Sequence, residues 1–181
     1  MSFPHPGLAD AYQLAYVTSD LARAIRLFKS RLTVDDFLTV TLHLNLTTPA
    51  ARASINVGVA WVGDLQIELI EPVSGAIQIY RDAIPSDPAA VAFHHLAMRV
   101  SGDLPRWNDA RAGIADDRIA IEGGSDGMRF AYVDERSTLG HFLEYVWMSE
   151  RFLARNPFWA LPSRRHATPP HSLHPATKLK E

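Results

Sequence analysis

The chain of 181 residues carries a formal net charge of −2 and contains no cysteine. Its length fits one medium domain or two small fused modules, and its charge gives no sign of binding to nucleic acid or to an anionic membrane. Without cysteine there are no disulfides, thiolate ligands or thiol nucleophiles, so any metal must be held by oxygen and imidazole. No apolar run approaches a membrane span. The N-terminus does not look like a signal peptide, and we expect a cytoplasmic location.

The first half of the chain predicts a strand, a helix and three further strands. They are expected over residues 11–17, 20–31, 35–47, 53–62 and 65–71. The helix is indicated by apolar residues at helical spacing after several cap candidates. Pro49 separates the second and third strands, and Pro72 is expected to end the fourth. Residues 1–10 are then an N-terminal extension, and residues 11–75 a first module.

The same order of elements returns in the second half. It is expected over residues 92–100, 103–112, 117–122, 128–133 and 139–147. Residues 76–91, rich in turn formers, are interpreted as a linker between the first module and a second module at 92–148. A repeated unit of this length indicates duplication. The glycine-rich residues 123–127 are interpreted as a turn that borders a cleft.

Residues 149–181 predict a C-terminal helix followed by a tail rich in proline and histidine. The tail is interpreted as flexible or loosely docked, or as packing along a partner subunit. Its histidines lack the fixed spacing of metal ligands; they are His166, His171 and His174.

Four short stretches, in order and at matching spacing, carry a resemblance to a known family. They are Gln13–Asp20, Leu65–Pro72, His94–Val100 and Leu139–Val146. Together they resemble the vicinal oxygen chelate superfamily, which includes glyoxalase I, methylmalonyl-CoA epimerase, extradiol dioxygenases and antibiotic-resistance binding proteins. Over residues 11–148 the resemblance implies an α+β fold. In that fold, two tandem βαβββ modules form a cup-shaped, partly closed mixed β-sheet barrel with flanking helices.

The resemblance also implies one divalent metal ion, bound by Gln13, Glu68, His95 and Glu144. Strand alternation and burial support this set, because a glutamate among apolar strand residues is costly to bury unless a partner offsets its charge. Three oxygen donors and one imidazole suit Zn, Ni, Co, Mn or Fe, and less clearly Mg. Each residue alone also has an ordinary interpretation. Gln13 and Glu68 would face solvent, His95 would be a satisfied core histidine, and Glu144 would pair with an arginine.

The activity that the resemblance implies is that of an isomerase, epimerase or lyase, with a metal-stabilised enolate formed α to a carbonyl. Glu144 is the first candidate for the base and Glu68 the second. Arg99, on the ligand face, would hold an anionic substrate group or pair with Glu144. His43 would line the cup as an extra acid or base, or be a solvated strand histidine. His94 is expected to face away from His95, against a helix.

Two other functions stay open at this stage. One is a non-catalytic protein that binds or sequesters a small molecule. The other is an Fe(II) ring-cleaving dioxygenase, which Gln13 disfavours because a histidine is needed in its place. The expected partners are a small molecule with a carbonyl or vicinal oxygens and a second copy of the chain in a homodimer. Whether the site closes within one chain or across the dimer is left open.

Overall fold

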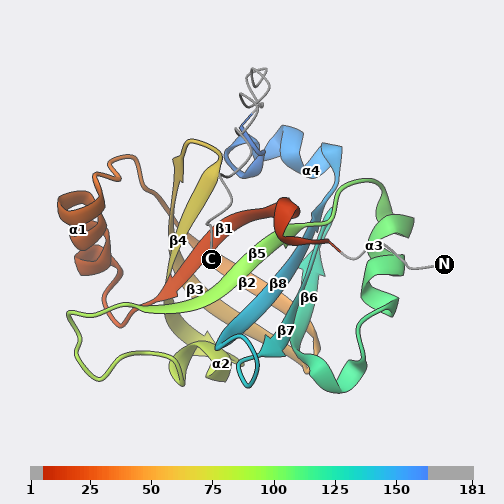
Figure 1. Ribbon diagram of the computed structural model, residues 1–181, viewed down its shortest axis with the longest axis horizontal. Helices are drawn as coiled ribbons and strands as arrows, with labels where there is room; N and C mark the ends of the chain where they lie inside the picture. Colours follow the sequence, from red (N-terminus) through yellow and green to blue (C-terminus); the bar gives the residue numbers. More distant parts are fainter. Residues whose placement is uncertain (1–5, 163–181) are drawn as a thin grey trace, which may run out of the picture.

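In the computed structural model, which describes residues 6–162, eight strands form a closed barrel (Figure 1). The strands are β1 (Ala11–Val17), β2 (Leu38–Thr48), β3 (Ala50–Val62), β4 (Leu65–Gly75), β5 (Ala92–Arg99), β6 (Ile119–Ser125), β7 (Met128–Glu135) and β8 (His141–Met148). Around the barrel they follow the order β1-β4-β3-β2-β6-β7-β8-β5. The pairs β1–β4 and β5–β8 are parallel and the other pairs antiparallel, so the sheet is mixed.

Two longer helices cover the outside of the barrel on opposite sides (Figure 1). Helix α1 (Leu21–Leu32) begins where the Asp20 carboxylate accepts a hydrogen bond from the Arg23 amide, a typical N-cap. Its apolar face packs on residues of β1, β3 and β4. Helix α3 (Leu104–Ala112) packs Trp107 and Ala110 on residues of β5, β7 and β8. The outer faces of these strands are therefore buried under helices.

Shorter helices lie at the two ends of the barrel (Figure 1). Helix α2 (Gln78–Arg81) contributes Tyr80 to the core inside the barrel. At the other end lies helix α4 (Glu150–Arg155). Three 3₁₀ helices complete the described chain: η1 (Leu8–Asp10), η2 (Asp116–Arg118) and η3 (Pro157–Trp159).

The predicted α+β class with a mixed barrel and flanking helices is confirmed. The barrel closes completely, because β2 also pairs with β6. Each half of the chain contains strand, helix and three strands in that order. The division into modules with a linker at residues 76–91 stays a prediction. No helix within residues 6–162 is long and apolar enough to cross a membrane.

Two sequence expectations about strand ends were wrong. Strand β4 does not end at Pro72 but continues to Gly75, and its register against β3 shifts between Ser54 and Ile55. We attribute this to a bulge that accommodates proline, which has no amide hydrogen for the ladder. Strand β6 likewise continues through Gly123, where an added Cβ would lie 2.4 Å from the Asn45 carbonyl oxygen. Glycine thus lets β6 approach β2 closely enough to close the barrel.

Candidate functional site

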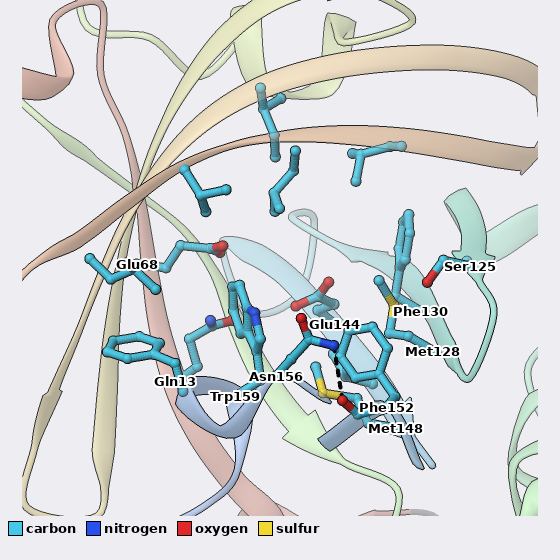
Figure 2. A pocket seen from close by; sticks show the side chains of 18 of the residues that line it. Gln13, Glu68, Ser125, Met128, Phe130, Glu144, Met148, Phe152, Asn156 and Trp159 are labelled. Atoms are coloured by element: carbon cyan, nitrogen blue, oxygen red, sulfur yellow. Dashed lines mark hydrogen bonds between the residues drawn. The ribbon is translucent and has the colours of Figure 1, made fainter. Parts of the chain in front are cut away.

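The barrel contains a cavity of about 580 Å³, lined on one side by residues of α4 and of the segment that follows it. Gln13, Glu68 and Glu144 point into it (Figure 2). Its remaining surface is mostly apolar. The apolar lining includes Leu38, Val40, Leu42, Leu44, Ile55, Met128, Phe130, Val146, Met148, Phe152, Phe158 and Trp159. The cavity therefore has a small polar floor and a large apolar wall, as small-molecule sites commonly do.

The segment formed by α4 and η3, which we call the C-terminal strap, forms part of the lining of this cavity. The Trp61 indole nitrogen donates a 2.8 Å hydrogen bond to the Phe158 carbonyl, and the Arg99 guanidinium donates one of 3.1 Å to the Trp159 carbonyl. Both bonds come from the barrel and bind backbone of the strap. Phe158 and Trp159, which follow the helix in the predicted C-terminal segment 149–181, are thus bonded to the barrel, whereas His166, His171 and His174 lie outside the described residues.

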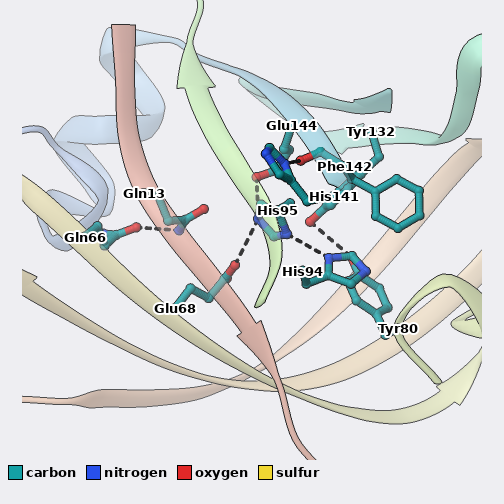
Figure 3. A network of polar contacts seen from close by, with 10 residues as sticks. All are labelled: Gln13, Gln66, Glu68, Tyr80, His94, His95, Tyr132, His141, Phe142 and Glu144. Atoms are coloured by element: carbon teal, nitrogen blue, oxygen red, sulfur yellow. Dashed lines mark hydrogen bonds and ion pairs between the residues drawn. The ribbon is translucent and has the colours of Figure 1, made fainter. Parts of the chain in front are cut away.

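The four predicted ligands come from four neighbouring strands, β4, β1, β5 and β8, within one chain. All are nearly inaccessible: the exposed fraction is 2% for Gln13, 6% for Glu68, 0% for His95 and 8% for Glu144. The Nε2 atom of His95 lies 3.6 Å from Glu68 Oε2 and 3.3 Å from Glu144 Oε2 (Figure 3). The residues that the sequence scattered over 132 positions are therefore gathered on one side of the barrel.

His94 does not face away from His95 as expected. The register of β5 against β1 shifts between the pairs Ala15–His95 and Tyr16–Phe93, so His94 is the extra residue of a β-bulge. Both rings are buried, and their Nδ1 atoms lie 3.0 Å apart. Strict alternation of side chains along β5 fails here, and two imidazoles come into contact.

This contact determines which nitrogen of His95 carries hydrogen. His94 Nε2 lies 3.1 Å from the Ile79 carbonyl, which only accepts, so His94 Nε2 must donate. The Nδ1 of neutral His94 is then an acceptor, and His95 Nδ1 must donate to it. The remaining His95 nitrogen, Nε2, has no hydrogen-bond partner within the described residues. It therefore presents a free lone pair to the two glutamates.

Burial sets the charge states of this cluster. It lowers the pKa of His95 to about 3, with a smaller contribution from His141, and lowers that of His94 to about 3, with a smaller contribution from His95. It raises the pKa of Glu68 and of Glu144 to about 8, and the Glu144 charge raises that of Glu68 further. Since His95 is neutral, its contacts with the carboxyl groups are close approaches and not ion pairs.

Sequence reasoning missed two tyrosines of the site. The Tyr132 hydroxyl hydrogen-bonds to Glu144, which favours the carboxylate, and the Tyr80 hydroxyl donates to Tyr132 at 3.2 Å. The Tyr80 ring also stacks on His94 with centroids 5.0 Å apart. Both tyrosines are buried and look like ordinary core residues in the sequence. The one indication was strand pairing: Tyr132 of β7 lies directly opposite Glu144 of β8.

Gln13 is positioned by a second glutamine that the sequence analysis did not single out as a site residue. The Gln13 side-chain nitrogen donates a 2.7 Å hydrogen bond to Gln66 Oε1, and both side chains are buried. The Gln13 oxygen then points away from Gln66, towards the side on which Glu144 and His95 lie (Figure 3). An amide oxygen held in this way is available as a donor to a cation.

The two residues proposed to bind substrate lie apart from this cluster. Arg99 is buried, but its guanidinium lies 4.5 Å from the centre of the Tyr12 ring and binds the strap. It does not line the cavity, and it forms no ion pair with Glu144. His43 is exposed on β2 and borders the cavity. Gly124 and Ser125, from the glycine-rich stretch, also border it.

The residues present fit a divalent cation. The orphaned lone pair of His95 Nε2, two buried carboxyl groups and an amide oxygen are the donor types that such ions accept. Within residues 6–162, however, no group of three or more His, Asp or Glu side chains already has the arrangement of a formed metal site. An ion would therefore have to draw these side chains together.

The barrel and its polar floor define the chain as a member of a class of mixed-barrel proteins. A family model described as the glyoxalase/bleomycin resistance protein/dioxygenase superfamily matches residues 12–132, and the chain belongs to this family. The superfamily proposed from the four sequence stretches is thereby confirmed. A comparison with curated proteins gives no match.

Solved structures similar to the chain share little sequence with it. One is a hypothetical protein from Bacillus halodurans, with 18% identity over 77% of this chain and 94% of that chain, at a TM-score of 0.49. Methylmalonyl-CoA epimerase variants are also found. One from Streptomyces coelicolor, in complex with 2-nitronate-propionyl-CoA, has 13% identity over 76% and 95% of the chains and a TM-score of 0.48. Methylmalonyl-CoA epimerase from Mycobacterium tuberculosis has 16% identity over 80% and 91%, with a TM-score of 0.47. At this level the likeness transfers no activity to the chain.

Proposed function

We propose that the chain is a divalent-metal-dependent isomerase, epimerase or lyase that removes a proton α to a carbonyl of a small substrate. The observation that carries the proposal is the free lone pair of His95 Nε2, which lies 3.3 Å from one buried carboxyl oxygen and 3.6 Å from another. Burying two glutamates against a neutral imidazole costs stability unless a cation balances them. Buried ionisable groups that lower the stability of the fold in this way are typical of functional sites.

Gln13, Glu68, His95 and Glu144 would hold the ion, with His95 oriented by its hydrogen bond to His94. A divalent ion supplies a Lewis acid that polarises a carbonyl oxygen and offsets the charge that develops there. Zn, Ni, Co, Mn, Fe and Mg all remain candidates, because the donor set alone does not select among them.

Glu144 is the proposed base. Its carboxylate accepts the Tyr132 hydrogen bond, which orients it and stabilises its charged form. Burial raises its pKa towards neutrality, where a general base is most effective. Glu68, on the other side of His95, is the second candidate. An apolar ligand lying against the apolar wall and the strap would displace water from around the proton that is transferred.

The test combines metal titration with hydrogen exchange in deuterated water. The wild-type protein should bind one divalent ion per chain, and His95→Ala should lower the affinity most. Exchange α to the carbonyl of a true substrate should require the metal and fall on the order of a hundredfold to ten-thousandfold in Glu144→Gln. Glu71→Gln, on the same strand as Glu68 but hydrogen-bonded to Asn56, is the matched control. A protein that neither contains nor gains metal would overturn the proposal.

A second candidate function is that of a non-catalytic protein that sequesters a small molecule. One observation favours it: the lining of the cavity is mostly apolar and includes the strap, which suits the enclosure of a small apolar molecule. Tight binding of apolar ligands by a protein free of metal, with no α-exchange, would select this function.

A ring-cleaving dioxygenase is less well supported. It would need a second histidine beside the carboxylate, but both ring nitrogens of His94 are engaged, one with Ile79 and one with His95. Oxygen uptake with catechols and Fe(II) tests it. The homodimer and the cytoplasmic location also stay predictions; light scattering tests the former.

A further inference from the structure

The cavity is unusual in the charges that it lacks. Two ionisable carboxyl groups, Glu68 and Glu144, line it, yet among the described residues that line it there is no lysine and no arginine. The histidine on its border, His43, is exposed on the far strand β2. Within residues 6–162, a negatively charged ligand would therefore find no lysine or arginine on the cavity lining with which to pair.

Arg99, the arginine on the strand that carries His95, is held by contacts outside the cavity lining. Arg99 lies on β5 four residues after His95, but its guanidinium packs on the Tyr12 ring and donates to the Trp159 carbonyl of the strap. Turning Arg99 into the cavity would break the bond that holds the strap and leave the Trp159 carbonyl without that donor. Its role is to hold the strap and not to bind an anion.

The side chains of β2 that face into the barrel opposite the polar floor are apolar: Leu38, Val40, Leu42 and Leu44. On β2, Val40 lies opposite Val57 of β3 and Leu42 opposite Ile55, which is the face that looks into the barrel. Leu38 and Val40 are 42% and 37% exposed, although they are on this inner face. Apolar side chains that stay accessible inside a cavity are ready to be covered by an apolar ligand.

We propose that the site selects an uncharged, largely apolar organic ligand with a carbonyl and a neighbouring oxygen at one end. This inference rests on the proposed function for the role of the carbonyl end, but its charge selection follows from the cavity alone. The oxygens would lie at the floor beside Glu68 and Glu144, and the apolar body against β2 and the strap.

Charge balance explains the selection. With a divalent ion bound, two carboxylates already neutralise it, so an added carboxylate or phosphate on the ligand would stay unbalanced. Without an ion, no lysine or arginine of the described lining balances the ligand charge. In either state the charged group loses its hydration within a mostly apolar wall and gains no cation to balance it, which is unfavourable.

The experiment compares two probes that differ by one charge: 2-hydroxyacetophenone and its 4-carboxylate. Calorimetry measures the affinity of each for the zinc-loaded and the metal-free protein. The neutral probe should bind at least tenfold more tightly in both states. Val40→Arg introduces a cation on the inner face of β2 and should improve binding of the carboxylate at least tenfold. Thr41→Arg, one residue on and outside the cavity lining, is the matched control and should change neither affinity.

The outcomes separate this inference from the proposed function. Equal or tighter binding of the carboxylate by the wild-type protein would overturn the inference, even if metal-dependent α-exchange occurs. Preference for the neutral probe without any exchange would support the inference while the proposed reaction fails. If Val40→Arg does not improve binding of the carboxylate while it keeps the wild-type fold by circular dichroism, charge is not what the cavity selects, and the inference fails.

Discussion

Replacing Glu144 by glutamine should stabilise the metal-free protein. Burial raises the pKa of Glu144 from 4.5 to about 8. A carboxyl group whose pKa is higher in the folded than in the unfolded state contributes stability below the unfolded pKa and loses it as the pH rises through the folded value. At about 1.4 kcal/mol per pKa unit, the full penalty at alkaline pH is about 5 kcal/mol. Glutamine is uncharged and avoids it.

Urea denaturation with chelator present, at several pH values from 5 to 9, measures the difference. We expect Glu144→Gln to match the wild type within about 1 kcal/mol at pH 5 and to exceed it by about 2–5 kcal/mol at pH 9. The urea dependence of the free energy of unfolding should be the same for both proteins, which excludes a change in the unfolded state.

Adding a divalent ion should reverse the order, because the ion stabilises only the folded chain that holds its ligands together. Glu71→Gln, a glutamate on the outer part of β4, is the control and should show neither effect. A metal-free wild type that gains stability relative to Glu144→Gln as the pH rises would refute the reasoning about the buried pair.

Three further predictions concern the residues around the cluster. His94→Phe keeps a ring but removes the acceptor for His95 Nδ1. Nitrogen NMR should then show loss of the single His95 tautomer, and metal affinity should fall about tenfold or more. His94→Asn, with an acceptor oxygen near the same place, should restore both. Trp61→Phe removes one of the two hydrogen bonds to the strap. In stopped-flow experiments it should raise the rates of ligand entry and release without loss of the barrel fold. Unchanged rates would show that the strap does not control access. Gly123→Ala should lower the free energy of unfolding by about 1–3 kcal/mol, while Gly7→Ala, where nothing lies within 4 Å, should be neutral; equal effects would contradict the close approach of β6 to β2.

Much of the fold followed from patterns that are local in the sequence. Helical spacing after Asp20 and strand-forming runs around Gln13 and Glu68 indicated the elements and their order. The ends of β4 and β6 did not follow, because they depend on neighbours that are far away in the chain. Pro72 is tolerated through a shift in pairing with β3, and Gly123 is required by a carbonyl of β2.

The candidate site was predictable as a set of residues but not as a network. The resemblance to the vicinal oxygen chelate superfamily grouped Gln13, Glu68, His95 and Glu144, and the alternation of side chains along strands supported the group. The bulge at His94 cannot be read from alternation, since a single extra residue inverts the faces on one side of it. Nor could the sequence indicate that Arg99 would bind the strap, because its partner is a backbone carbonyl, which every residue has.

The two sides of the barrel contribute different kinds of residue to the cavity. The proposed chemistry lies on β4, β1, β5 and β8, whereas β2, on the opposite side, supplies a wall that is mostly apolar, with Thr39 and His43 at its border. Substitutions such as Leu42 to a smaller or larger residue would then alter which molecules fit while the polar floor stays intact. Such a barrel can adapt to a new ligand through substitutions on one strand alone. Strand β2 is therefore the natural target for a library of variants aimed at changed specificity.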